Sequence, residues 1–119
     1  MEQVGTGTAV IRQSDVPWSE VTQGMEITRG ITQAGFTTLG GGWVRMDGSG
    51  ELAGWTLKYD EVLYCVEGEI EVEEHGGQTA VAQAGEGILI GEGATVTYRA
   101  RRPSLIFFVL NPRDWAERS

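Results

Sequence analysis

The chain has 119 residues, of which 17 are acidic and 9 are Lys or Arg, so its formal net charge is −8 at neutral pH. This length suits one domain, and 40% hydrophobic with 22% charged residues is typical of a folded globular protein. The acidic balance argues against nucleic acid and against an anionic membrane surface as partners, because both require clustered Lys and Arg.

Short strands separated by turns are predicted along the chain, because 18 glycines punctuate runs rich in Val, Ile, Thr, Tyr and Trp. A first strand is expected at Thr8–Arg12, followed by one helical turn capped by Ser14. Further extended segments are expected, in chain order, at Met25–Ile31, Phe36–Met46, Leu52–Lys58, Glu61–Val66, Glu69–Glu73, Gln78–Ala82, Gly87–Ile90, Thr95–Arg99 and Ser104–Leu110. Residues 111–119 form a terminal turn or short helix. No shift of composition marks a boundary, so residues 1–119 are predicted to be one domain with a core at about 36–111.

Glycine clusters and alternation fix several local features. Gly40–Gly42 and the Gly85-x-Gly87 segment are interpreted as β-turns, and neither has the context of a nucleotide-binding loop. Within Glu69–Glu73 the glutamates alternate with apolar residues, which predicts a strand with one face inward. A hairpin turn is expected at residues 74–77.

The segment Val62–Val66 is apolar at every position. Because a strand alternates its faces, both faces of this one must be covered. One face is expected to line the barrel interior, and the other to pack against a second sheet or a second copy of the chain. We therefore predict a homodimer formed through packed sheets.

Single cysteine and histidine residues restrict the chemistry. Cys65 cannot form an internal disulfide, which favours a reducing cytoplasm, and residues 1–10 lack the apolar segment of a signal peptide. The longest apolar run, residues 105–110, is far shorter than the roughly 20 residues of a membrane helix. His75 is the only histidine, so one chain cannot build a metal site from several histidines.

Two segments resemble the sequence motifs of the cupin superfamily. The first motif runs Gly, five residues, His-x-His, three or four residues, Glu, six residues, Gly, and the spacing from Glu61 to Gly68 matches its end. The second runs Gly, five residues, Pro-x-Gly, two residues, His, three residues, Asn. Residues 85–96 keep its glycines, with Gly91 in the proline position and Val96 in the histidine position. The resemblance implies an all-β fold, the double-stranded β-helix or jelly-roll barrel of the cupins, in a single domain.

A closer similarity covers about residues 36–115. Residues 55–61, 67–69 and 84–85 resemble the cupin domain of ethanolamine-utilisation proteins of the EutQ type. That similarity implies a dimeric barrel, a link to ethanolamine catabolism with its protein-shelled microcompartments, and a proposed acetate-kinase-type activity.

The resemblance also implies where a metal would bind. Metal-binding cupins hold iron, manganese or zinc with three histidines and a glutamate. With three residues between the second histidine position and Glu61, the first two histidine positions fall on Trp55 and Leu57. With four residues between them, they fall on Gly54 and Thr56. The third histidine position falls on Val96. Only Glu61 keeps a ligand type. Since one carboxylate in an apolar barrel cannot hold a divalent ion tightly, we predict no metal and no other cofactor.

Glu61 is the candidate catalytic residue. Burial in an apolar pocket favours the neutral form of a carboxyl group and raises its pKa, which suits a general acid or base. The alternative is a core glutamate that ties strands together by hydrogen bonds.

Aromatic and cationic residues near the motifs are candidates for ligand contacts. Aromatic walls with few polar groups suit a small organic ligand, and an arginine or lysine near the mouth suits an anionic one. The residues expected to contact the ligand are Trp43, Trp55, Tyr64, Tyr98, Arg45 and Lys58.

Three functions fit these residues. The first is a metal-independent cupin that binds and transforms a small metabolite, in ethanolamine or related catabolism, with Glu61 as acid or base. The second is a non-catalytic ligand-binding or accessory cupin. The third is an acetate-kinase-like phosphotransferase, which would need a cationic clamp drawn from Arg29, Arg45, Lys58 and Arg99. The substrate and its pathway stay open, as does whether the ligand is anionic or neutral.

Overall fold

The computed structural model describes residues 1–117, which are mostly β-strands. In chain order the strands are β1 (Glu2–Gln3), β2 (Ala9–Val10), β3 (Ser19–Thr22), β4 (Met25–Thr28), β5 (Gly40–Met46), β6 (Glu51–Thr56), β7 (Asp60–Glu67), β8 (Glu69–Glu74), β9 (Thr79–Gln83), β10 (Gly87–Ile90), β11 (Thr95–Arg99) and β12 (Ser104–Asn111). The helices are η1 (Gln13–Asp15), α1 (Gly30–Ala34) and η2 (Trp115–Glu117). None of the helices in residues 1–117 has the length and apolarity needed to cross a membrane.

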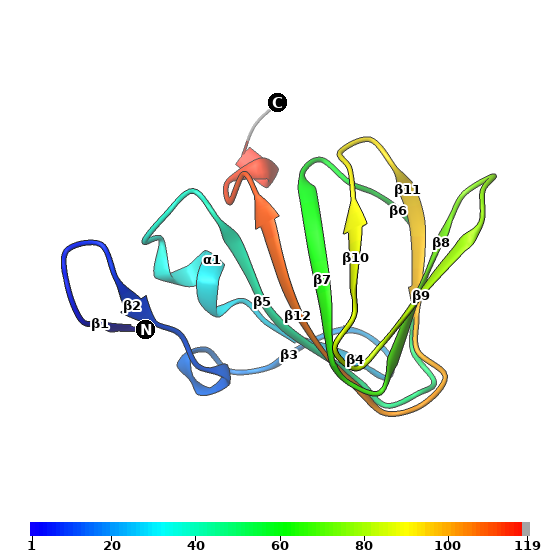
Figure 1. Ribbon diagram of the computed structural model, residues 1–119, viewed down its shortest axis with the longest axis horizontal. Coiled ribbons are helices and arrows are strands. Elements are labelled where there is room, and N and C mark those ends of the chain that lie inside the picture. The colour runs from blue at the N-terminus through cyan, green and yellow to red at the C-terminus, as the bar shows by residue number, and fades with distance from the viewer. Residues whose placement is uncertain (118–119) are drawn as a thin grey trace.

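Two antiparallel sheets enclose a common core (Figure 1). The larger sheet has the strand order β10-β7-β12-β5-β4-β3, and the smaller has the order β6-β11-β8-β9. The short strands β1 and β2 pair separately beside the N-terminus. Apolar side chains from both sheets pack into one cluster. This is the all-β jelly-roll barrel that the motif resemblance predicts.

Alternation along β7 shows how the sequence builds both faces of the larger sheet. Leu63 and Cys65 are buried in the core, as is Glu61. The residues between them point the other way, with Val62 42% and Tyr64 44% exposed. The segment is therefore apolar on both faces, as predicted, but in the single chain only its inner face is covered.

The glycine triplet Gly40–Gly42 is part of strand β5, which corrects the prediction of a β-turn. These glycines are required by close approach of neighbouring strands. A Cβ atom on Gly41 would overlap the carbonyl oxygen of Phe108 on β12, and one on Gly42 would overlap that of Thr28 on β4. The triplet therefore lies where β4, β5 and β12 approach too closely to admit a side chain.

The N-terminal third differs from its prediction. The first expected strand shrinks to β2, and Arg12 rather than Ser14 occupies the N-cap of η1. Strand β4 ends at Thr28 and α1 follows it, ending at Gly35 in the left-handed conformation. A helix of five residues is too short for a 3.6-residue hydrophobic period to appear in the sequence. The prediction therefore extends a strand through Ile31 and places no helix at residues 32–34.

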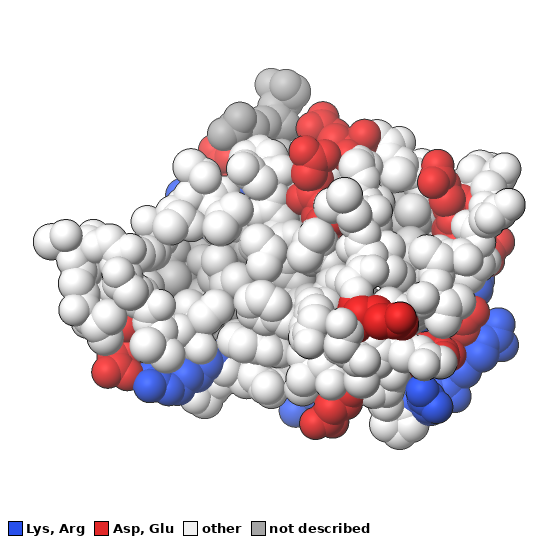
Figure 2. Space-filling view, in the orientation of Figure 1, with Lys and Arg blue, Asp and Glu red and all other residues white. Residues whose placement is uncertain are grey.

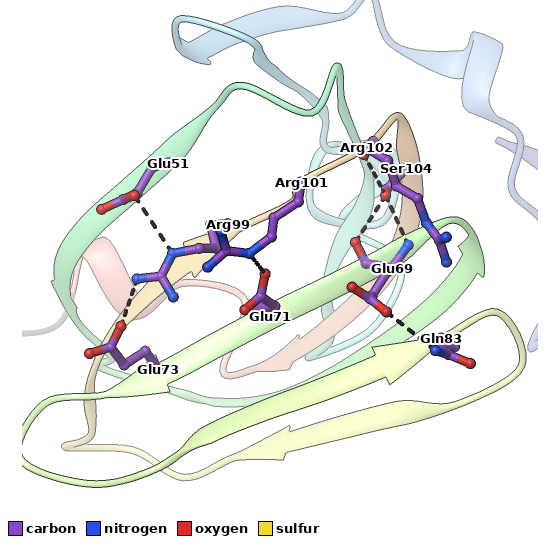
Figure 3. A network of polar contacts seen from close by, with 9 residues as sticks. All are labelled: Glu51, Glu69, Glu71, Glu73, Gln83, Arg99, Arg101, Arg102 and Ser104. Atoms are coloured by element: carbon purple, nitrogen blue, oxygen red, sulfur yellow. Dashed lines mark hydrogen bonds and ion pairs between the residues drawn. The ribbon is translucent and has the colours of Figure 1, made fainter.

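The outward face of the smaller sheet carries paired charges (Figure 3). Arg99 on β11 places its guanidinium 2.6 Å from the carboxylate of Glu73 and 3.6 Å from that of Glu51. Arg101 lies 2.6 Å from the carboxylate of Glu71 on β8. The inward positions of β8 between these glutamates hold buried apolar residues, as the alternation predicts.

The outward face of the larger sheet is apolar around β7 and β10. Leu89 is 80% exposed and pairs across the strands with Val62, while Val66 is 38% exposed. Figure 2 shows few charged side chains over the middle of the molecule, in the region of β12, β7 and β10. We call Val62, Tyr64, Val66 and Leu89 the apolar face.

Candidate functional site

A cavity of about 650 Å³ lies inside the barrel, between the two sheets. Its walls are largely apolar side chains from β4, β5 and β12, and the segment after β12 also contributes to them. This size and lining suit a small organic molecule.

Two polar side chains meet inside this cavity, one from each sheet. Glu61 of β7 and Tyr98 of β11 are both 6% exposed, and the Tyr98 hydroxyl donates a 2.8 Å hydrogen bond to Oε1 of Glu61. Both occupy inward positions of their strands, so strand alternation aims them at each other across the barrel. Both residues are candidates predicted from the sequence, and the structure brings them together.

Burial decides the protonation of this pair. It raises the pKa of Glu61 to about 7, and the hydrogen bond from Tyr98 only partly offsets this rise. Burial, together with the nearby Glu61 charge, also raises the pKa of Tyr98 far above its ordinary value. Near neutral pH the Glu61 carboxyl therefore exchanges a proton readily, whereas Tyr98 keeps its proton.

The second oxygen of Glu61 is open to the cavity. Among residues 1–117 no hydrogen-bond partner is found for Oε2, and no fully buried side-chain oxygen or nitrogen lacks a partner. Oε2 must therefore be within reach of a molecule in the cavity.

Three aromatic side chains form one wall. Trp115 packs against Trp55 with the rings nearly perpendicular, at 86° and 6.0 Å between centroids, and against Tyr59 at 5.0 Å. The indole N–H of Trp55 donates a 2.8 Å hydrogen bond to the Tyr59 hydroxyl. Burial, with the Glu61 charge as a second cause, raises the pKa of Tyr59 to about 12.

Two of these wall residues were not among the predicted contacts. Tyr59 lies in the loop between β6 and β7, two positions before Glu61 and next to Lys58, which is a predicted contact residue. Trp115 belongs to η2, after the last strand. A large aromatic residue in an otherwise polar terminal segment was the available signal that this segment packs back onto the barrel.

Charged side chains also line the cavity. The acidic ones are Glu20, Asp114 and Glu117, and the basic ones are Arg29 and Arg113. Arg29 precedes α1 and lies close enough to Tyr59 to act on its pKa, in the lowering direction. The Nε–H of Arg113 donates to the Thr37 carbonyl.

Four predicted contact residues lie outside this cavity. Tyr64 and Trp43 occupy outward positions of the larger sheet, where Trp43 packs on Phe107. Arg45 points outward as well, where it pairs with Glu26 at 2.8 Å and stacks on Trp18. Lys58 is exposed and does not line the cavity. Strand alternation explains the outward positions of Tyr64, Trp43 and Arg45. Each of them is adjacent in its strand to a residue that points into the core, so its own side chain points outward.

The side chains present do not fit the metal of the metal-binding cupins. Leu57 and Val96 are core residues, 1% and 2% exposed, and Trp55 is part of the aromatic wall. Among residues 1–117 no three His, Cys, Asp or Glu side chains gather as a metal site requires. His75 lies in the turn between β8 and β9.

Comparisons with known proteins agree on a family. The family model described as ethanolamine utilisation protein EutQ matches residues 21–117. Acetate kinase EutQ of Escherichia coli (strain K12) is 36% identical over 61 residues, which are 51% of this chain and 26% of that protein. The chain thus spans about a quarter of the length of that curated relative.

Solved structures share the fold. The crystal structure of a putative ethanolamine utilization protein q from Salmonella typhimurium LT2 has a TM-score of 0.79 and 25% identity, covering 95% of this chain and 92% of that chain. An RmlC-like cupin from Shewanella frigidimarina has a TM-score of 0.67 and 16% identity, covering 82% and 84%, which shows the fold alone.

Proposed function

The chain belongs to the EutQ family of ethanolamine utilisation proteins, and we propose that its barrel binds a small metabolite beside Glu61, which gives or takes a proton. The proposal includes transformation of that metabolite without a metal. Binding without turnover is the alternative, and the same site would serve both.

One observation carries this proposal. The Glu61 carboxyl is buried beside a cavity of about 650 Å³, with one oxygen held by Tyr98 and the other within reach of a ligand. A general acid or base acts best when its pKa lies near the working pH, and that of Glu61 is about 7. The hydrogen bond from Tyr98 fixes the orientation of the Glu61 carboxyl during proton transfer.

Phosphoryl transfer has less support than binding of a metabolite. The activity named for the curated relatives would need several cations around a phosphate. Arg45 and Arg99 are engaged in ion pairs on the outward faces of the sheets, and Lys58 is exposed away from the cavity. Of the four cations predicted as a possible clamp, only Arg29 lines the cavity.

Ligand-detected and protein-detected NMR with mixtures of small metabolites would test the proposal. A ligand should shift resonances of Glu61, Tyr98 and Trp55, and Glu61→Gln should weaken its binding or, for a substrate, abolish its conversion. Glu73→Gln, a change of the same chemistry on the outward face, is the matched control and should change neither. Ligands that shift only surface resonances would contradict the proposal.

We also propose that the apolar face is covered by a second copy of the chain. Its four residues are 38–80% exposed, which is costly to leave in water. Apolar side chains need no oppositely charged partner, so the same surface on a second copy complements them across a two-fold axis.

A further inference from the structure

Four side chains of the cavity, those of Glu61, Tyr98, Trp55 and Tyr59, present mostly hydrogen-bond acceptors to a ligand. The O–H of Tyr98 is donated to Glu61, which leaves the hydroxyl oxygen able to accept. The N–H of Trp55 is donated to Tyr59. Ionised Glu61 only accepts, and its Oε2 faces the cavity. The hydroxyl proton of Tyr59 is the one buried donor left among these four side chains.

A ligand that satisfies these atoms must therefore bring donors. A carboxylate or phosphate brings only acceptors and would place a second negative charge beside Glu61. An ammonium group brings N–H donors together with the positive charge that a buried carboxylate lacks.

The aromatic wall suits a cation as well. Trp55 and Trp115 meet at 86°, and Tyr59 packs on Trp115. All three rings line the cavity that Glu61 also lines, and the Glu61 charge acts on Tyr59. Faces of Trp and Tyr attract organic cations, and boxes of such rings recognise alkylammonium groups. The wall thus offers contacts to the alkyl groups around a nitrogen as well as to its charge.

The surrounding charge points the same way. Besides Glu61, the cavity is lined by three carboxylates and two guanidinium groups among residues 1–117. The whole chain carries a net charge of −8. Both favour entry of a cation over entry of an anion.

We propose that the cavity selects an organic ammonium ligand, with its nitrogen against Oε2 of Glu61 and its alkyl part against Trp55, Tyr59 and Trp115. This inference rests on the proposed function, to which it adds the chemical class of the ligand. From the sequence, the ligand is expected to be either anionic or neutral. The proposed ligand is instead a cation.

Three probes of similar size and different charge would test it: n-butylammonium, n-butanol and butanoate. Binding is followed by NMR shifts of the barrel residues and by tryptophan fluorescence, at about pH 8 so that Glu61 is ionised and the amine is charged, and at constant ionic strength. We expect n-butylammonium to bind about tenfold or more tightly than either of the others, as one ion pair beside aromatic faces would produce.

Glu61→Gln keeps the size of the side chain and removes its charge. It should weaken n-butylammonium binding about tenfold while leaving n-butanol binding nearly unchanged. Glu73→Gln, on the outward face, should leave all three affinities unchanged.

The outcomes separate this inference from the function on which it rests. If butanoate or n-butanol shifts the barrel resonances and binds as tightly as n-butylammonium, the ammonium class is wrong and small-ligand binding in the barrel stands. If n-butylammonium does not shift them, the inference is also wrong, and the metabolite screen decides the function separately. Equal loss of n-butylammonium and n-butanol binding in Glu61→Gln would likewise overturn the role given to the charge.

Discussion

The outward side chains of the smaller sheet are paired by charge, whereas those of the larger sheet around β7 and β10 are apolar. Arg99 and Arg101 bind glutamates on neighbouring strands of the smaller sheet. On the larger sheet, Leu89 and Val62 stand side by side and unpaired with any polar group. The inward faces show no such contrast, because both contribute apolar residues to one core.

The contrast indicates what each sheet faces. Exposed ion pairs contribute little to stability but keep a sheet surface compatible with water. An exposed apolar patch indicates a surface that another molecule covers. We therefore expect the outward face of the smaller sheet to remain in solvent and the apolar face of the larger sheet to be covered by the second copy proposed above.

The largest expected effect is on association through the apolar face. Val62→Asp would place an unpaired charge inside the proposed interface, which costs about 3–5 kcal/mol for each buried charge, and a two-fold interface contains two. We expect the wild-type chain to have twice the 12.9 kDa mass of one chain, and the variant to have that of one chain. Light scattering coupled to gel filtration measures both masses.

The smaller sheet supplies the matched control for this comparison. Val81 on β9 is 50% exposed and points outward opposite Glu71. Val81→Asp should therefore leave the mass unchanged. A wild-type mass of 12.9 kDa at micromolar concentration would break the comparison, since the apolar face would then be exposed to water.

A second test compares the buried carboxyl with those on the outward face. The pKa of Glu61 is 4.5 when unperturbed and about 7 in the fold, so the folded protein holds an extra proton between these values. Its contribution to the free energy of unfolding is fully present below about pH 4.5 and is lost as the pH rises through 7, by about 3 kcal/mol.

Glu61→Gln removes this titration. The free energy of unfolding of the variant, minus that of wild type, should therefore increase by about 3 kcal/mol as the pH is raised from about 4 to 8. Urea unfolding at a series of pH values measures this difference. Glu73→Gln should not reproduce this gain. The same pH dependence in both variants would mean that it does not arise from burial of Glu61.

A third prediction concerns the bond that joins the two sheets inside the barrel. Tyr98→Phe removes the hydrogen bond that lowers the pKa of Glu61, so this pKa should rise above 7. Hydrogen bonds to charged groups contribute about 1.5–3 kcal/mol, which sets the expected size. Carbon-13 NMR of the labelled glutamate carboxyl, followed against pH, measures it. An unchanged pKa would show that Tyr98 does not hold Glu61.

The smallest effect is expected on the outward face of the smaller sheet. The Arg101 side chain is 71% exposed and that of Glu71 is 12% exposed, so water and salt reach their ion pair from the Arg101 side and screen it. Arg101→Gln should reduce the free energy of unfolding by less than about 1 kcal/mol, and the difference should shrink in high salt. A loss that is large and independent of salt would show that this face also depends on its ion pairs for folding.

Much of the fold followed from local pattern. From residue 60 onward the predicted strands agree closely with the observed ones, because apolar and polar residues there switch clearly at turns. The inward position of Glu61 and that of Tyr98 followed from the motif spacing and the strand positions. The five-residue helix α1 was missed, since so short a helix shows no periodicity.

The misplaced contact residues show the limit of this pattern. Tyr64 lies three positions after Glu61, so alternation places it on the other face of β7. The run Val62–Val66 hid this, because an apolar residue at every position gives no contrast between inside and outside. Arg45 and Trp43 likewise occupy outward positions, on β5.

The sequence by itself determined the class of fold, the strands of its second half and the placement of one carboxyl in an apolar barrel. These features depend on the pattern of apolar and polar residues close together in the chain, and that pattern can be read from the sequence. Only the tertiary structure decided which side chains surround that carboxyl. Trp115 lines the same cavity because the segment after β12 packs onto the barrel, where it contacts Tyr59 from the loop between β6 and β7. Such contacts join residues far apart in the chain, and their geometry is set by the packing of both sheets rather than by any local pattern.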